Sequence, residues 1–122
     1  MMTSARVHGA VAFVMDGAIR DADAFETYQF PCWARGISLR GPYKDGPGSI
    51  NVSVTIGGMV VNPGDVIVGD GDGIIAVPGE LAVHVATLAH AKVVHEQETI
   101  AAIINGTYSS AWVDATLKQK DI

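Results

Sequence analysis

The chain has 122 residues, of which 48% are hydrophobic and 17% charged, and its formal net charge is −5. This length favours a single domain over residues 1–122. No basic stripe is present, which argues against nucleic acid as a partner through phosphate contacts. A single cysteine, Cys32, excludes an intrachain disulfide framework and fits a reducing compartment. The apolar composition indicates either a fully buried sheet or a surface covered in an oligomer.

The amino-terminal stretch has a short apolar run that meets Asp16 without a small-residue cleavage pattern, so no signal peptide is predicted. The run is also too short to span a bilayer. We therefore expect a soluble, cytoplasmic protein without a membrane partner.

The first half of the chain is predicted to form short strands and one short helix. Residues 9–15 are apolar and end at Asp16-Gly17, which indicates a buried strand. A helix is expected over residues 21–28 and a second strand over 30–36. Residues 40–49 are rich in glycine and proline, contain two basic side chains, and are predicted to form a loop.

Residues 50–56 alternate apolar and polar side chains, as a half-buried strand does. The Gly57-Gly58 pair predicts a hairpin turn into residues 59–61. The segment Asn62–Asp65 is expected to turn, and two more strands are predicted over residues 66–70 and 73–78.

From residue 80 the pattern changes to helix. Residues 80–105 lack glycine and proline and are predicted to form one long helix or two abutting ones, stopped by Asn105-Gly106. A last helix is expected over residues 109–118. Strands and helices together place the chain in the α/β class.

The adjacent Arg20 and Asp21 can be interpreted in two ways. Asp21 can begin a helix, where a carboxylate in the first turn favours the dipole, with Arg20 as a solvated neighbour. Alternatively, the pair lies just beyond the carboxyl end of a strand, where α/β folds build their sites. There, aspartate is a hard oxygen ligand for Mg²⁺ or Mn²⁺, and arginine is a fork that fits a carboxylate.

Other polar residues favour plain structural roles. The segment Gly69–Gly73 lacks the later ligands of a calcium loop and predicts a tight hairpin turn. The histidines of the long helix, His84, His90 and His95, are not four residues apart and are expected at solvent or interface positions. Cys32 is expected to be a structural thiol.

The segments "GAVAFVMDGAIRDADAF", "FPCWARG" and "INVSVTIGGMVVNPGDVIVGDGDGIIAVP" occur in an order that resembles the RraA-like family. That family includes 4-hydroxy-4-methyl-2-oxoglutarate aldolases, which also decarboxylate oxaloacetate, and regulators of ribonuclease E activity. The resemblance covers roughly residues 5–106. Its most specific part is the combination DGxxRD followed by GGxxVxPGDxxxxDxDGxxxVP.

The resemblance implies a swivelling-type α/β/β sandwich that assembles as a homotrimer, or a hexamer of two trimers, with sites between subunits. Arg20 matches the arginine that holds the pyruvyl portion of the substrate, and Asp21 matches the aspartate that binds the divalent metal. Glu96 matches a glutamate that reaches the metal site of a neighbouring subunit. On sequence alone, Glu96 and Glu98 would be solvated residues of a helix face.

The ribonuclease regulators typically lack the aspartate after the arginine, and this sequence retains it as Asp21. The resemblance therefore implies a Mg²⁺- or Mn²⁺-dependent aldolase that cleaves 4-hydroxy-4-methyl-2-oxoglutarate or a related small 2-keto acid to pyruvate, with oxaloacetate decarboxylation as a side activity. Both reactions pass through a pyruvate enolate, whose charge a metal can stabilise as a Lewis acid. No lysine occupies a comparable motif, so a Schiff base is not favoured. One alternative is a non-catalytic interaction protein like the regulators. Another is a small-molecule binder that retains Arg20 and a metal without turnover.

The chain begins only a few residues before the DGxxRD strand, whereas family members usually carry a further amino-terminal segment with a Gly-rich loop that grips the substrate. The chain thus corresponds to the carboxyl-terminal portion of the family domain. Three interpretations are open: a misplaced gene start or truncated gene, a site wall supplied by another chain, or a fold that has lost catalysis.

Overall fold

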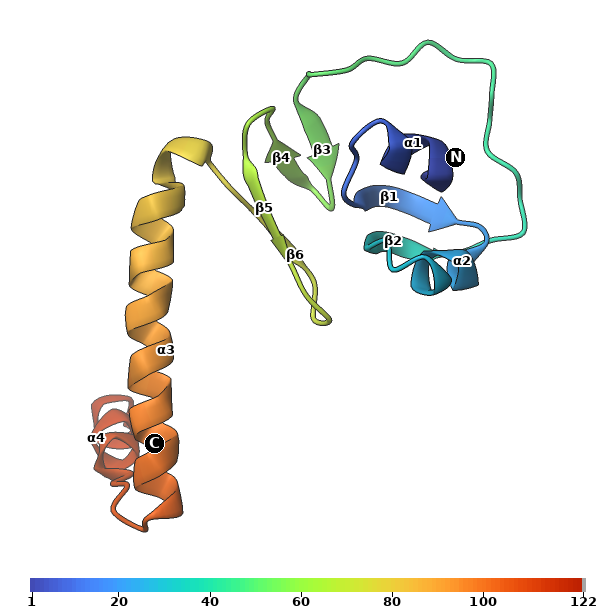
Figure 1. Ribbon diagram of the computed structural model, residues 1–122. Helices are drawn as coiled ribbons and strands as arrows, with labels where there is room; N and C mark the ends of the chain where they lie inside the picture. Colours follow the sequence, from blue (N-terminus) through green and yellow to red (C-terminus); the bar gives the residue numbers. More distant parts are fainter. Residues whose placement is uncertain (122) are drawn as a thin grey trace. The chain divides into compact units, whose positions relative to one another are not determined.

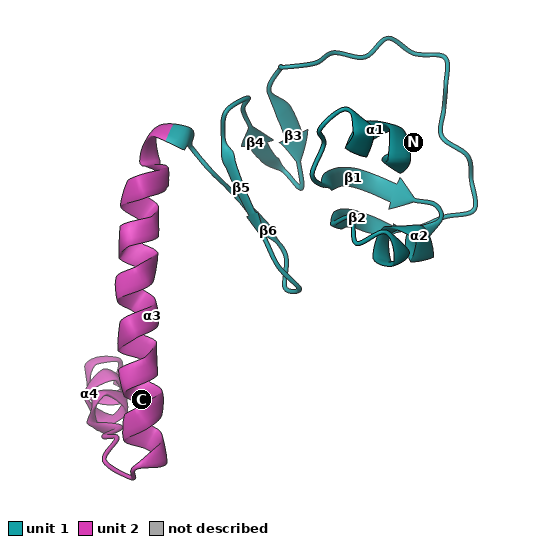
Figure 2. Ribbon diagram, in the orientation of Figure 1, with its two compact units in different colours: residues 1–79 teal, residues 80–122 magenta. Residues whose placement is uncertain are grey.

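The computed structural model describes residues 1–121 and divides into two compact units, residues 1–79 and a second that begins at Glu80 (Figure 2). Strands lie in the first unit and the long helices in the second (Figure 1), which confirms the predicted α/β class. In chain order the elements are α1 (Met2–Val7), β1 (Phe13–Ile19), α2 (Ala22–Thr27), β2 (Cys32–Ile37), β3 (Val54–Ile56), β4 (Met59–Val61), β5 (Val66–Gly69), β6 (Ile74–Val77), a 3₁₀ turn (Gly79–Leu81), α3 (Ala82–Ile104) and α4 (Ala111–Gln119).

The described strands pair into three two-stranded sheets, and β1 and β2 form the parallel one. The predicted strand over residues 9–15 was placed too early, because β1 begins at Phe13 and continues through Asp16-Gly17 to Ile19. The Asp-Gly pair does not end the strand, because other parts of the first unit satisfy the carboxylate of Asp16. β2 was predicted in nearly its observed position.

A cluster of three phenylalanines joins β1, α2 and the segment before β2. The ring centroid of Phe13 lies 5.1 Å from that of Phe30 and 6.0 Å from that of Phe25, both with edge-on geometry. Phe30 is 4% exposed, so this cluster forms the most buried point of the first unit. Each ring contributes through buried area and through the favourable edge-to-face arrangement.

Two antiparallel hairpins follow. The predicted turn at Gly57-Gly58 is confirmed between β3 and β4, and both glycines have positive φ, as such turns demand. The predicted strand over residues 50–56 is shorter than expected, since β3 starts at Val54. Asn51 has φ 54°, which breaks the extended backbone before β3.

The second hairpin, β5–β6, closes with the tight turn predicted over Gly69–Gly73. The backbone N–H of Asp70 donates to the carbonyl of Gly73 at 2.9 Å, and the Asp70 carboxylate accepts from the amide of Asp72 at 2.9 Å. Trp33 of β2 donates its indole N–H to the Asp70 carbonyl at 3.0 Å. A Cβ on Gly69 would lie 2.6 Å from the Trp33 ring, so this close approach requires glycine.

In the second unit, α3 ends where the sequence predicts. Gly106 follows the C-cap Asn105 with φ 70°, and the amides of Gly106 and Thr107 donate to the carbonyls of Ile103 and Ala102. This is the Schellman arrangement that terminates many helices at glycine. Across residues 1–121, no helix is both long enough and apolar enough to cross a membrane.

Candidate active site

Arg20 and Asp21 come directly after β1, at its carboxyl end. The Arg20 Nε atom lies 3.4 Å from Asp21 Oδ2, and the two side chains are 51% and 71% exposed. A surface ion pair of this kind contributes little to stability, about 0–1 kcal/mol. A contribution to stability therefore does not explain why Arg20 and Asp21 stand side by side.

Asp21 occupies the N-cap position of α2, as one of the two sequence interpretations expected. Its carboxylate, however, makes no capping hydrogen bond. Its backbone has φ 60° and ψ 43°, the left-handed region, which is uncommon for residues other than glycine but which aspartate adopts more readily than most. The Asp21 carboxylate is thus presented beside Arg20 instead of being used by the helix.

Both residues line a cavity of about 510 Å³ within the first unit. Its apolar part comes from α1, β1 and α2, and the segment after β2 contributes Ser38, Arg40, Gly41 and Pro42. A Cβ on Gly41 would lie 3.8 Å from the Arg20 Nη1 atom, so this segment runs close to the guanidinium. A volume of this size suits a small organic substrate.

Arg40 is a residue of this cavity that the sequence analysis did not single out. It was part of the predicted loop over residues 40–49, which is indeed without helix or strand. Its backbone N–H donates to Ser38 Oγ at 3.1 Å, which fixes the start of the loop. The sequence signal that could have identified Arg40 is the presence of two basic residues in a Gly/Pro-rich loop. Binding residues are found on loops disproportionately often.

Asp16 lies in β1, four residues before Arg20, and is the centre of a polar network that the sequence did not indicate. Its Oδ1 atom accepts from Nε of Arg35 in β2, and its Oδ2 atom accepts from the backbone N–H of Gly57 at 3.1 Å. The hydrogen bond from Arg35, followed by that from Gly57, lowers the pKa of the Asp16 carboxyl below its usual value. The same pair raises the pKa of Arg35.

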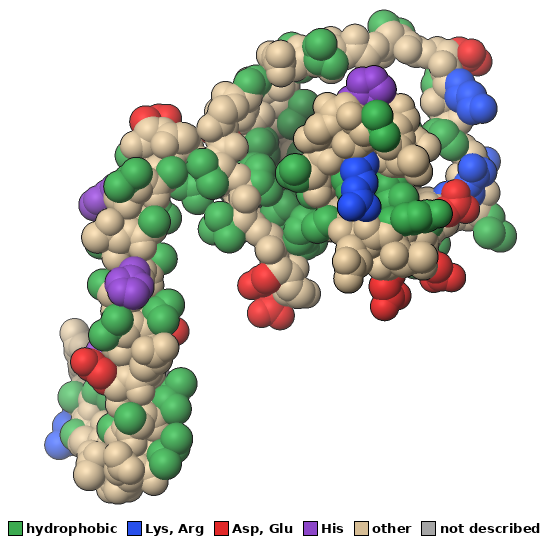
Figure 3. Space-filling model, in the orientation of Figure 1, with side chains coloured by type: hydrophobic (Ala, Val, Ile, Leu, Met, Phe, Trp, Pro, Cys, Tyr) green, Lys and Arg blue, Asp and Glu red, His purple; other side chains and the backbone are tan. Residues whose placement is uncertain are grey.

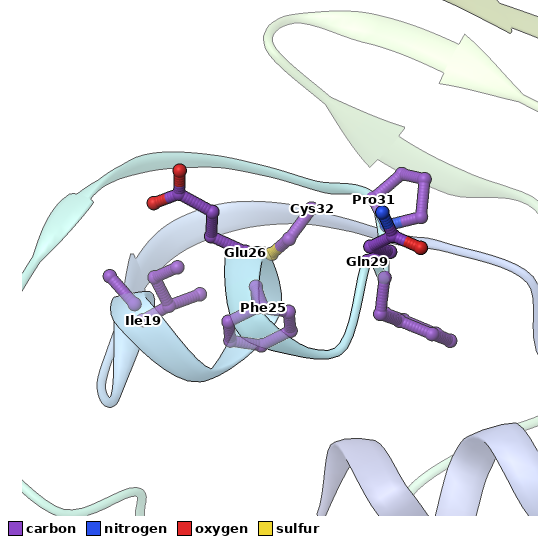
Figure 4. Close-up of a pocket in the computed structure, with 8 residues that line it drawn as sticks. Ile19, Phe25, Glu26, Gln29, Pro31 and Cys32 are labelled. Carbon is purple, nitrogen blue, oxygen red and sulfur yellow. The ribbon is translucent and has the colours of Figure 1, made fainter.

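A second cavity, of about 550 Å³, lies on the side of α2 that faces Cys32 (Figure 4). Figure 4 shows Ile19 and Glu26 at one end and Gln29 and Pro31 at the other, with Cys32 between them. Burial raises the pKa of the Cys32 thiol, so the unreactive thiol form is favoured at neutral pH. This agrees with the structural role expected for Cys32.

Glu96 lies in α3, in the second unit. Its carboxylate is 3.6 Å from the ammonium of Lys92 one turn earlier, and its side chain is 57% exposed. His95 Nδ1 lies 4.0 Å from the Glu98 carboxylate in the same helix. Within its own unit, Glu96 therefore has the surroundings of a solvated helix face, and its role toward a neighbouring subunit stays a prediction.

The donor set around Asp21 is compatible with a hard divalent cation. Through residue 121, no three His, Cys, Asp or Glu side chains gather into a metal-binding cluster. Mg²⁺ needs no such cluster, because it commonly binds through one or two carboxylates and fills its other positions with water and substrate oxygens. An exposed carboxylate that is not tied into a cap, at the rim of a cavity, fits that manner of binding.

Similarity in sequence and structure places the chain among known proteins. The family model described as RraA-like, Aldolase/RraA, matches residues 1–76, which contain both Arg20 and Asp21. A Halalkalibacterium halodurans protein provisionally named a 4-hydroxy-4-methyl-2-oxoglutarate aldolase is 45% identical over 74 residues, covering 61% of this chain and 35% of its own length. An uncharacterized Methanocaldococcus jannaschii protein is 32% identical over 95 residues, covering 78% of this chain and 45% of its own length.

Among solved structures, an uncharacterized protein of Pseudomonas syringae pv. tomato str. DC3000 superposes with a TM-score of 0.77 at 31% identity. The match covers 88% of this chain and 51% of that protein. The chain thus spans about a third to a half of the length of the relatives it matches.

Proposed function

The chain belongs to the RraA-like (Aldolase/RraA) family, and we propose that it takes part in metal-dependent cleavage of a small 2-keto acid to pyruvate. The observation that carries the proposal is the Arg20–Asp21 pair, which lines a 510 Å³ cavity with a carboxylate free of any capping bond. The substrate class is 4-hydroxy-4-methyl-2-oxoglutarate or a related compound, with oxaloacetate decarboxylation as a side activity. The name of the Halalkalibacterium halodurans relative supports this choice.

Arg20 binds the carboxylate next to the keto group. Its planar fork can form two parallel hydrogen bonds to that carboxylate, which fixes the orientation of the carbon–carbon bond that breaks. In the aldol cleavage, the C4 hydroxyl loses its proton and becomes the keto group of one pyruvate, while the electron pair of the broken bond forms the enolate of the other, which takes up a proton. In oxaloacetate decarboxylation the same electron pair forms the enolate, and the departing fragment is CO₂. The guanidinium stabilises negative charge that develops beside it.

Asp21 would hold Mg²⁺ or Mn²⁺ through its carboxylate. The bound cation supplies Lewis-acid stabilisation of the negative charge that develops on the keto oxygen. Arg20 is the neighbour of Asp21 in sequence and pairs with its carboxylate, so the residue that binds the substrate carboxylate lies beside the metal ligand.

Arg40 gives the same cavity a second positive charge. 4-Hydroxy-4-methyl-2-oxoglutarate carries a second carboxylate at the far end of the molecule, and Arg40 is suited to bind it. A keto acid with one carboxylate would lack this contact. The proposal therefore includes a preference for dicarboxylic 2-keto acids.

The proposed assembly is a homotrimer or hexamer in which Glu96 reaches the metal site of a neighbouring copy. Apolar side chains of both strands of the β5–β6 hairpin stay exposed, among them Val68 at 54% and Ile75 at 55%. Figure 3 shows hydrophobic side chains on the visible face of these strands and along α3. Exposed apolar surface of this kind supports contacts between subunits.

The test measures pyruvate formation from oxaloacetate and from 4-hydroxy-4-methyl-2-oxoglutarate with Mg²⁺. Wild type should exceed buffer plus metal, and Asp21→Asn should lower kcat/KM by about 100-fold or more, since it removes a metal-ligand charge. Asp23→Asn is the matched control, because Asp23 lies in the first turn of α2 but does not line the cavity. Wild-type rates equal to metal alone would contradict the lyase proposal and favour the non-catalytic interaction protein.

A further inference from the structure

The pairing between β1 and β2 contains an irregularity just before the candidate site. Met15 pairs with Ala34, whereas Ala18 pairs with Gly36, so two residues of β1 lie opposite one residue of β2. The two are Asp16 and Gly17, and the residue opposite them is Arg35. This is a β-bulge, which is rare between parallel strands and is often found next to active sites.

The bulge changes which side chains of β1 share a face. In a regular strand, side chains alternate, so Arg20 would lie on the face opposite to Phe13 and Met15. The 510 Å³ cavity is nevertheless lined by Phe13, Met15, Ala18 and Arg20, together with Ile19 at the strand end. Met15 and Ala18 pair with two residues of β2 that are only two positions apart, so the bulge places Met15 and Ala18 on the same face of the sheet. Arg20 lies two residues after Ala18 and lines the same cavity, as do its neighbours Ile19 and Asp21.

The bulge is held by side-chain contacts from two other elements. Both carboxylate oxygens of Asp16 are occupied, Oδ1 by the Arg35 guanidinium and Oδ2 by the Gly57 amide of the β3–β4 turn. The Asp16 side chain is 30% exposed and the Arg35 side chain 64%. Asp16 therefore accepts from the residue opposite the bulge and from a turn 41 residues away.

We propose that Asp16 and Arg35 are positioning residues that lock the Asp16–Gly17 bulge and thereby present Arg20 to the substrate cavity. The catalytic consequence rests on the proposed function, whereas the effect on strand register does not. Neither residue touches the substrate. They act through the backbone of β1, which leads directly into Arg20 and Asp21.

The test compares wild type with Asp16→Ala and Arg35→Ala by two-dimensional NMR of the full chain. The readouts are the cross-strand contacts Ala18–Gly36 and Ile19–Ile37 and the amide resonance of Gly57. Both variants should lose or shift these register contacts. The matched control is Asp65→Ala, since Asp65 Oδ2 accepts the amide of Asn62 at 2.8 Å in a turn away from β1. The control should keep the register.

Activity gives the second readout. Asp16→Ala should lower kcat/KM for pyruvate formation by about 10- to 100-fold, as loss of a positioning contact does, while Asp65→Ala stays within about twofold. The double variant Asp16→Ala/Arg35→Ala should be no worse than either single variant, because the two residues act together. If Asp16→Ala does not fold, Asp16→Asn replaces it, since its amide oxygen can still accept from one of the two donors.

An unchanged register in Asp16→Ala would overturn the positioning proposal, whatever the rates. Equal losses of activity in Asp16→Ala and Asp65→Ala would also overturn it, because they would indicate general destabilisation. If wild type itself forms no pyruvate, the proposed function fails, and the NMR comparison still decides whether Asp16 and Arg35 hold the bulge.

Discussion

The two units of the chain are stabilised by contacts of very different range. In the helical unit, the side-chain hydrogen bonds and ion pairs of the described residues join positions two to five apart, as Lys92 and Glu96 do. In the strand unit, Asp16 is bonded to Arg35, 19 positions away, and to Gly57, 41 positions away. The helices are thus defined by near neighbours, whereas the candidate site is built by distant segments.

This difference explains where function is concentrated. Local side-chain contacts along a helix contribute about 0.2–0.5 kcal/mol per pair and leave the side chains free to rearrange. Contacts between distant segments fix side chains against each other, and a site needs that precision. Substitutions should therefore have large effects in the strand unit and small effects in the helical unit.

The largest effect is expected for Phe30→Ala. Phe30 is 4% exposed and packs against Phe13, so its loss leaves a cavity in the strand unit and should lower the free energy of unfolding by about 3–5 kcal/mol. Leu88→Ala in α3, where Leu88 is 57% exposed, should cost less than about 1 kcal/mol. Urea unfolding with hydrogen exchange of the β1 and α3 amides measures both. Similar losses in the two variants would break the contrast between the units.

Arg20→Lys should have the next largest effect. Lysine keeps the charge but not the planar fork, so kcat/KM for oxaloacetate should fall by about 100-fold, while thermal stability changes little. Lys118→Gln in α4 removes a positive charge from the helical unit and should leave kcat/KM within about twofold. Steady-state kinetics at saturating Mg²⁺ measure both variants. Full activity of Arg20→Lys would show that charge alone suffices.

Glu96→Gln examines whether the helical unit has one long-range role. If Glu96 completes a neighbouring metal site, the Mg²⁺ concentration for half-maximal activity should rise by about tenfold or more. Glu98→Gln, two residues away in the same helix, is the control and should not change this concentration. Sedimentation of both variants reports the assembly. Identical Mg²⁺ dependence in the two variants would leave Glu96 with only its local pair to Lys92.

The smallest effect is expected for the dependence of the melting temperature on acidic pH. The folded-state pKa of Asp16 is lowered by Arg35 and Gly57, so its stabilising contribution is present above the unfolded-state pKa and is lost as pH falls through the folded-state value. Melting temperatures between about pH 5 and pH 2 should therefore fall less steeply in Asp16→Asn than in wild type. The control Asp23→Asn should follow wild type. Parallel curves for Asp16→Asn and wild type would contradict this account.

Much of the secondary structure was predictable from local signals. Glycine pairs set the hairpin turn at Gly57-Gly58, and Asn105-Gly106 ended the long helix where expected. The errors concern the bounds of two strands, β1 and β3. The Asp16-Gly17 pair resembled a strand end, but Arg35 and Gly57 satisfy the carboxylate and the strand continues. The strand over residues 50–56 was shortened by the left-handed backbone of Asn51.

The sequence by itself determined the α/β class, most of the element boundaries and the family, because these depend on periodicity, turn residues and motifs read along the chain. It also singled out Arg20 and Asp21. Only the tertiary structure decided that the Asp21 carboxylate makes no capping bond, that Arg40 shares the cavity and that a bulge precedes Arg20. The physical reason is range: strand register and the partners of Asp16 depend on segments that are far apart in the chain and meet only when it folds.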